Sequence, residues 1–298
     1  YIGRMAGYSE TGAYNDTMLG NSAGQHQNMG GIGGTYSYNT NLGYRAGYYN
    51  VTGTSNTYVG NEAGFSRTGA SNVAVGADAL FGGGAGGITS GDANVAVGVT
   101  AGAFVQGNAT THIGSYAGRF ASGSNNVSVG YQAGRGSITS APYSTGTNNT
   151  AIGYEALYGF TTAERTTAVG YQAGYQATTS RFGVFLGYRA GYAVTTADFG
   201  PIAIGHSALG AMTDKTGNTA VGYEAAYAND TATQATFLGY ASARLSTGGV
   251  NSTIIGSQAG MYIVGSDITH IGYQTGYYAT GSYNTFVGAE AGKGGTTS

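Results

Sequence analysis

Asn149-Thr-Ala-Ile-Gly-Tyr-Glu-Ala-Leu157 is one copy of a short pattern that recurs along the whole 298-residue chain. Similar copies are Asn56-Thr-Tyr-Val-Gly-Asn-Glu-Ala-Gly64 and Asn218-Thr-Ala-Val-Gly-Tyr-Glu-Ala-Ala226. Alignment on the aliphatic–glycine pair gives seventeen copies, whose glycines we call anchor glycines: Gly3, Gly20, Gly43, Gly60, Gly76, Gly98, Gly114, Gly130, Gly153, Gly170, Gly187, Gly205, Gly222, Gly239, Gly256, Gly272 and Gly288. Successive anchors lie 16 to 18 residues apart, except for three intervals of 22 or 23. Such a period indicates a repeat protein in which each copy forms one unit of a stack.

The residues before each anchor glycine predict a short β-strand. The residue immediately before the anchor is Val, Ile or Leu in all seventeen copies, and the residue two places earlier is Thr, Val or Ile in the sixteen copies that reach so far. Side chains two apart on a strand share a face, so these two columns are expected to form the buried stripe. The residue between them varies, as at Tyr58, Ala74 and His112, which is typical of a less constrained face.

The residues around the strand predict tight turns and close packing. Ala stands three residues past the anchor in fifteen copies, and Gly follows it in twelve. A small residue recurring at one position indicates that backbones approach closely there. The anchor glycine is expected in a conformation that other residues avoid, and the Asn that often precedes the strand is interpreted as a turn former.

Taken together, these columns predict an all-β fold: a β-solenoid or β-roll of about seventeen coils of 16–18 residues. Residues 1–298 are expected to form a single repeat array, a fragment of a longer fibre, with longer loops at 25–38, 81–93 and 135–148. Each repeat offers two inward residues and an alanine, which is a thin core for one coil alone. We therefore expect a parallel homotrimeric fibre with a shared core; a monomeric solenoid is the alternative.

Composition excludes several classes of protein. With 57 Gly but only 2 Pro the chain is not collagen-like, and 26 Tyr with 8% charged residues is not typical of disorder. A net charge of −2 gives no reason to expect a nucleic-acid partner. Apolar runs are too short for membrane insertion. The absence of Cys excludes thiolate metal sites and thiol chemistry.

Two features resemble catalytic patterns. Gly20-Asn-Ser-Ala-Gly24 matches the nucleophile elbow of hydrolases around Ser22, but no Asp or His partner recurs in a suitable context. Glu62 and Asp78 occupy the same repeat position on successive coils, at a spacing that suits the carboxylate pair of a retaining glycosidase. Gln and Arg share that position in other copies, which favours a solvated face. We predict that the chain is not an enzyme.

No cofactor and no metal site is predicted, because the four histidines are scattered: His26, His112, His206 and His270. The candidate contact surface is aromatic instead. Immediately after the anchor, six consecutive coils carry a ring: Tyr154, Tyr171, Tyr188, His206, Tyr223 and Tyr240. Stacked at one-coil spacing, these rings are expected to form a ladder that stabilises the fold. The alternative is that the tyrosines contact glycans.

The repeat Asn-Thr-Ala-Val/Ile-Gly-Tyr-Gln/Glu-Ala-Gly/Leu resembles repeats of bacteriophage tail fibres and related bacterial surface proteins. It is also similar to the head repeats of trimeric autotransporter adhesins. The resemblance covers essentially the whole chain. It implies a trimeric β-roll that is extracellular, at a cell surface or on a virion, and that presents a binding surface. The partners it implies are further copies of the chain and a cell-surface glycan.

The predicted function is a structural or adhesive fibre segment without catalysis. Two alternatives stay open: an ice- or surface-binding β-solenoid, and a polysaccharide depolymerase of the tailspike kind. Four valines in the Thr column argue against ice binding, because free exchange of Thr for Val is typical of buried positions: Val73, Val95, Val127 and Val184.

Overall fold

The computed structural model describes residues 1–8, 15–26, 36–83, 90–137, 144–195, 200–213, 216–229 and 231–294. The chain divides into two compact units, Tyr1–Ala151 and Ile152–Ser298. Among the described residues every regular element is a β-strand, so the predicted all-β class is confirmed. The loops predicted at 25–38, 81–93 and 135–148 lie partly outside the described residues, which include only 25–26, 36–38, 81–83, 90–93, 135–137 and 144–148 of them.

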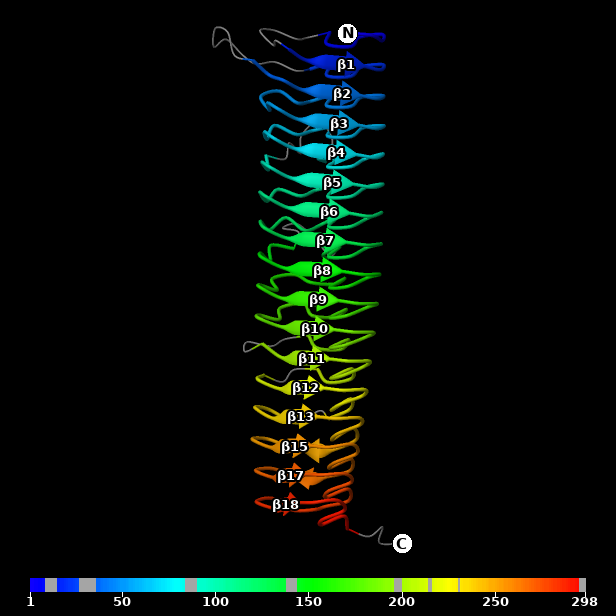
Figure 1. Cartoon of the computed structure of the whole chain (residues 1–298). Helices are drawn as coiled ribbons and strands as arrows, with labels where there is room; N and C mark the ends of the chain where they lie inside the picture. Colours follow the sequence, from blue (N-terminus) through cyan, green and yellow to red (C-terminus); the bar gives the residue numbers. More distant parts are fainter. Residues whose placement is uncertain are drawn as a thin grey trace. The chain divides into compact units, whose positions relative to one another are not determined.

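Each unit is a parallel β-solenoid whose coils each add one short strand to a main parallel sheet (Figure 1). In the N-terminal unit each strand pairs with the next in chain order: β1 (Thr17–Leu19), β2 (Thr40–Leu42), β3 (Thr57–Val59), β4 (Val73–Val75), β5 (Val95–Val97), β6 (Thr111–Ile113) and β7 (Val127–Val129). The chain passes from one unit to the other within β8 (Thr150–Ile152).

In the C-terminal unit the main sheet is again parallel and follows chain order: β9 (Thr167–Val169), β10 (Val184–Leu186), β11 (Ile202–Ile204), β12 (Thr219–Val221), β13 (Thr236–Leu238), β15 (Thr253–Ile255), β17 (Thr269–Ile271) and β18 (Thr285–Val287). A second, two-stranded sheet joins β14 (Thr247–Gly248) to β16 (Val264–Gly265). The register pairs equivalent repeat positions, as in Thr219 with Thr236.

The anchor glycines end the strands in a conformation that only glycine adopts readily, as predicted. All seventeen have φ between 125° and 140°, and each lies against an anchor of the neighbouring coil. A Cβ built on Gly170 would stand 2.4 Å from the carbonyl oxygen of Gly187. The alanines three residues further on are also close-packed, and Ala63 and Ala173 have no exposed surface. These two columns bring successive coils together.

The prediction of which strand face is buried was wrong. In every three-residue strand except β18 the middle residue is buried, and its two neighbours are half-buried or exposed. Tyr58, Ala74 and His112 are therefore core residues with no exposed surface. The regular Thr and aliphatic columns point outward. The middle column varies because the interior holds side chains of different sizes from coil to coil.

Interior volume is shared between the strand-middle residue and the residue four past the anchor. Where the latter is Leu80 or Leu209, the strand-middle residue is Ala74 or Ala203. Where the strand-middle residue is large, the facing residue is Gly, or Ala243 opposite Phe237; a Cβ on Gly118 would stand 2.0 Å from Nδ1 of His112. Close packing leaves little free space in protein interiors, so a large side chain in one of these columns is accompanied by a small residue in the other.

A ladder of buried asparagines precedes the strands of the N-terminal unit. Asn39, Asn56, Asn72 and Asn94 are at most 1% exposed. The backbone N–H of each of the last three donates to the side-chain oxygen one coil earlier, at 2.8–3.0 Å. The Asn56 amide also donates to the Gly69 carbonyl at 2.9 Å. These asparagines were predicted to form turns; in addition they bridge consecutive coils through buried hydrogen bonds.

His112 makes the stability of the N-terminal unit depend on pH. Burial, with a smaller contribution from the Arg67 charge, lowers the pKa of its imidazole from 6.5 to about 3. Below pH 6.5 the unfolded chain binds a proton that the folded chain does not, until pH falls to about 3. We therefore expect the free energy of unfolding to fall by about 2 kcal/mol between pH 7 and pH 5 from this group alone.

The measurement is urea unfolding at pH 7 and pH 5 for the parent chain and for His112→Phe, because Phe185 and Phe237 occupy the same column. The difference between the two chains isolates His112 from the carboxylates, which titrate in both. Equal pH dependence in the two chains would contradict the assignment.

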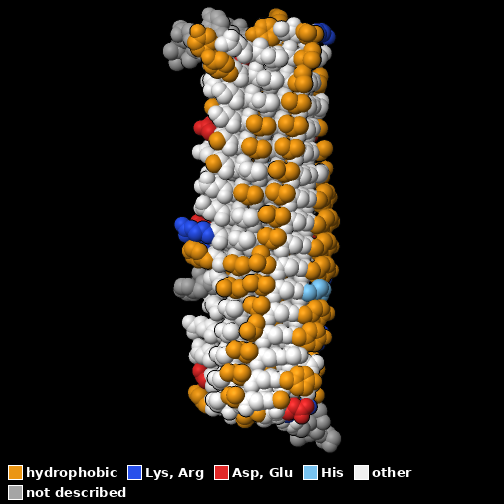
Figure 2. Space-filling view, viewed as in Figure 1, with side chains coloured by type: hydrophobic (Ala, Val, Ile, Leu, Met, Phe, Trp, Pro, Cys, Tyr) orange, Lys and Arg blue, Asp and Glu red, His pale blue; other side chains and the backbone are white. Residues whose placement is uncertain are grey.

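The outward columns give each unit an apolar, uncharged face. Several of the aliphatic residues that precede the anchor glycines are 36–66% exposed: Leu19, Leu42, Val75, Val97, Ile113, Leu238, Ile271 and Val287. None of the strands in the described part of the chain contains Asp, Glu, Lys or Arg. Figure 2 shows hydrophobic side chains in columns that run across the strands.

Candidate functional site

The predicted tyrosine column is a continuous stack within the C-terminal unit. Ring centres of the six members, Tyr154 to Tyr240, lie 4.8–5.2 Å apart along the column, with interplanar angles of 7–15°. The tyrosines are 42–53% exposed. Each inner ring has a neighbouring ring on both faces, so only its edge and hydroxyl reach solvent. This geometry suits a stabilising ladder and leaves little room for a sugar to stack on an inner ring; the role of the column stays a prediction.

A second aromatic column lies five residues past the anchors, and between Tyr158 and Tyr227 one coil interrupts it. Tyr158, Tyr175 and Tyr192 stack with ring centres 5.0 and 5.1 Å apart. The next coil has Gly210 at this position, and the following coil has Tyr227. A cavity of about 300 Å³ occurs at the interruption and is lined by Tyr192, Gly210 and Tyr227 together with Arg189 and Ser207. Sequence reasoning missed this site, although a single glycine among tyrosines was its signal.

The two carboxylates compared with a glycosidase pair line one cavity in the N-terminal unit. Glu62 and Asp78 share a space of about 190 Å³ with Phe81, Phe104 and Arg119. Burial, followed by the charge of Glu62, raises the pKa of Asp78. Glu62 is an ion-pair partner of another coil, because its Oε1 accepts a hydrogen bond from Arg45 at 2.8 Å. Two neighbouring carboxyl groups in different environments are the usual basis of acid–base catalysis, but the space of about 190 Å³ is below the usual range for small-molecule sites.

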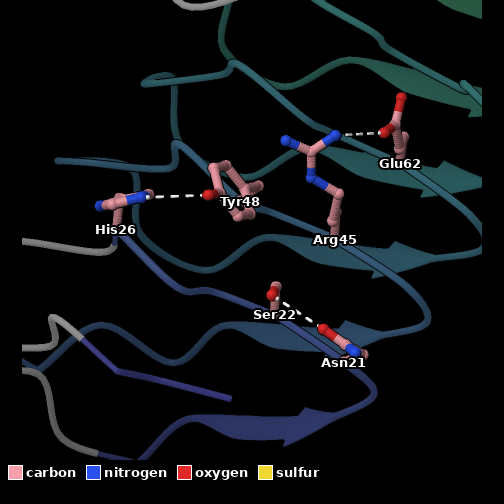
Figure 3. Close-up of polar contacts among 6 residues, drawn as sticks. All are labelled: Asn21, Ser22, His26, Arg45, Tyr48 and Glu62. Atoms are coloured by element: carbon pink, nitrogen blue, oxygen red, sulfur yellow. Dashed lines mark hydrogen bonds and ion pairs between the residues drawn. The ribbon is translucent and has the colours of Figure 1, made fainter. Parts of the chain in front are cut away.

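The environment of Ser22 differs from that of a hydrolase nucleophile (Figure 3). Its hydroxyl donates to Oδ1 of the adjacent Asn21 at 2.9 Å, and its side chain is 8% exposed. His26 is engaged elsewhere, because a 3.2 Å hydrogen bond joins its Nε2 to the hydroxyl of Tyr48. The structure therefore does not bring Ser22 and His26 together.

The remaining histidines are dispersed. His206 belongs to the tyrosine column, whereas His112 and His270 lie inside their coils. In the part of the chain that the structure describes, no three His, Asp or Glu side chains are grouped as a metal site would require. The same described ranges contain no apolar helix of membrane-spanning length.

No protein-family model, no curated protein and no solved structure matches this chain.

Proposed function

We propose that this chain is a non-catalytic segment of a structural, adhesive fibre, outside the cell or on a virion, in which three parallel copies pack through their outward strand faces. The observation that carries the proposal is the uncharged aliphatic face on each unit. Burying a side chain that is about 40% exposed contributes roughly 1 kcal/mol, so a row of them is sufficient to drive association. Closed symmetry is the usual arrangement of identical chains.

The sequence suggested a trimer because the core of a single chain was expected to be thin. The expected thin core is absent, because the strand-middle residues, the alanines and the asparagines fill each coil from one chain. A shared core is therefore not required for folding. What needs a partner is the outward apolar stripe, and further copies of the chain present the same stripe at the same coil spacing.

Sedimentation equilibrium of the chain tests the proposal, and a trimer is the expected species. Val97→Lys combined with Ile113→Lys places two charges on the outward face and should shift the chain toward the monomer, with an unchanged circular dichroism spectrum. The matched control places two lysines outside the strands, at the exposed Thr52 and Asn61, and should stay trimeric. A parent chain that sediments as a monomer would sink the proposal.

Several observations support a non-catalytic role. Ser22 is held by Asn21, and Glu62 is held by Arg45. The cavity beside Asp78, at about 190 Å³, is smaller than the 300 Å³ or more that is typical for small-molecule sites. A polysaccharide depolymerase would need a longer cleft around these carboxylates.

Surface binding is a second candidate, favoured by the outward position of the Thr column. Val73 and Val95 are half-buried rather than buried, so the argument from Thr–Val exchange against ice binding was wrong. Parallel strands repeat this column at about 4.8 Å, which gives a regular array. Thermal hysteresis, measured for the parent chain and for the monomeric lysine variant, distinguishes ice binding from fibre assembly. Ice binding requires hysteresis in the parent chain, whereas fibre assembly does not.

A further inference from the structure

We propose that the C-terminal unit holds a binding site for a six-membered ring that carries a carboxylate, in the cavity where Gly210 interrupts the second aromatic column. The inference rests on the adhesive part of the proposed function and names the class of ligand. In the setting of a fibre, the source of such a group is an acidic sugar residue of a surface polysaccharide.

The second aromatic column lacks one ring at this cavity. Tyr175 stacks on Tyr192 with ring centres 5.1 Å apart, but the coil after Tyr192 contributes only Gly210. The cavity of about 300 Å³ reaches the lower end of the range for small-molecule sites. Tyr192 and Tyr227 both line it. A flat or chair-shaped ring therefore has aromatic walls to pack against.

The N-terminal unit contains a complete version of the same arrangement. Arg45 lies two residues past its anchor, and its guanidinium carbon is 4.6 Å from the ring centre of Tyr48. The next coil supplies the Phe65 ring, 4.7 Å from that carbon. It also supplies the Glu62 carboxylate, which pairs with the guanidinium at 2.8 Å. Arg45 is thus satisfied by one ring and one carboxylate from the following coil.

Arg189 occupies the same repeat position but lacks both of these partners. Its guanidinium carbon lies 4.2 Å from the Tyr192 ring centre. The following coil has Ser207 where Glu62 would be and Gly210 where Phe65 would be. Within the described ranges the Arg189 side chain makes no hydrogen bond or ion pair, and its Nε is buried without a partner.

A ligand that completes this arrangement has to supply what the coil omits. A carboxylate would accept charge-assisted hydrogen bonds from the Arg189 guanidinium, and the Ser207 hydroxyl can donate to the same group. The Tyr227 ring leans over Gly210, where an added Cβ would stand 2.8 Å from it, so a ligand ring would lie in the cavity that Tyr192 and Tyr227 both line. Acetate supplies only the carboxylate and a neutral sugar only the ring, so neither satisfies both parts of the site.

The test is a titration of the full chain with glucuronate and, separately, with benzoate. Calorimetry and NMR of the ligand measure the binding. For ligands of this size we expect a dissociation constant on the order of 1 mM. Acetate and methyl glucoside should bind at least about tenfold more weakly. Tighter binding of glucuronate assigns the source to an acidic sugar, and tighter binding of benzoate assigns it to an aromatic acid.

Two variants test the residues. Arg189→Gln removes the guanidinium and keeps a residue that the same column holds at Gln172, and it should weaken binding about tenfold or more. Ser207→Glu supplies an internal carboxylate at a backbone position with φ 54°, close to the 53° of Glu62. It should abolish binding by pairing with Arg189. The matched control, Gln258→Glu, changes the same column away from the cavity and should bind as the parent chain does.

Absence of binding by both acids at about 20 mM, or equal binding by the parent chain and both variants, would overturn the site. These outcomes leave the oligomeric state unchanged, so a failed site and a failed fibre proposal are distinguishable by sedimentation.

Discussion

Gly170→Ala is expected to lower the free energy of unfolding of the C-terminal unit by about 4 kcal/mol or more. The anchor glycine has φ 135°, where side chains with a Cβ are strained. The added methyl would also stand 2.4 Å from the carbonyl oxygen and 2.7 Å from the carbonyl carbon of Gly187. These are backbone atoms, so relief requires two coils to separate and the parallel pairing of β9 with β10 to weaken. Urea unfolding followed by far-ultraviolet circular dichroism gives the measurement.

The matched control is Gly159→Ala in the same unit. There a Cβ would meet only the Tyr175 carbonyl oxygen, at 3.4 Å, and φ lies outside the left-handed region. A Gly→Ala change at a compatible position alters stability by about 1 kcal/mol or less. Similar unfolding midpoints for the two variants would show that the anchor contact is not what holds the coils together.

The second large effect is expected when the large side chain is moved from the strand-middle position of a coil to the position four past its anchor glycine. Gly118→Leu should cost about 3 kcal/mol or more, because its Cβ alone would stand 2.0 Å from the His112 ring. His112→Ala should cost about 2 kcal/mol by leaving a cavity. The double variant reproduces the pairing of Ala203 with Leu209 and should unfold within about 1 kcal/mol of the parent chain.

Backbone geometry allows this exchange. Leu209 has φ 50° and Gly118 has φ 59°, so the leucine enters a conformation that other coils already use for leucine. The coil after Gly118 carries Ser128 and Gly134, which are small enough to accept the new side chain. A double-mutant cycle in urea gives the coupling energy. Additive losses would mean that the two columns do not share one space.

The sequence was sufficient to predict the stacked coils, the anchor glycines and the close-packed alanines, because these positions tolerate almost no other residue. It misled on the strand faces for a physical reason. Regular apolar columns are usually core, but in these coils the interior is narrow and its occupants alternate in size. Leu80 opposite Ala74 was a readable signal that the two columns compensate, and it would have placed the variable column inside.

The candidate site was harder to foresee. The tyrosine column could be predicted because its members recur at one position, whereas the cavity at Gly210 depends on what is missing from a column. Arg189 alone resembles any solvated arginine. Its significance appears only beside Arg45, whose ring and carboxylate partners come from the following coil at a distance fixed by the stack.

The hydrogen bonds that join consecutive asparagines have a consequence for how fast the chain folds. They connect residues only 16 or 17 apart in sequence where no longer loop intervenes, and the strand pairs of each unit have similar separations. For the unit Tyr1–Ala151 the corresponding relative contact order is roughly 0.11, in the range of helical bundles rather than of all-β sandwiches. Folding of each unit can begin at any coil and propagate to its neighbours, so a β protein of this design avoids the slow search for distant strands.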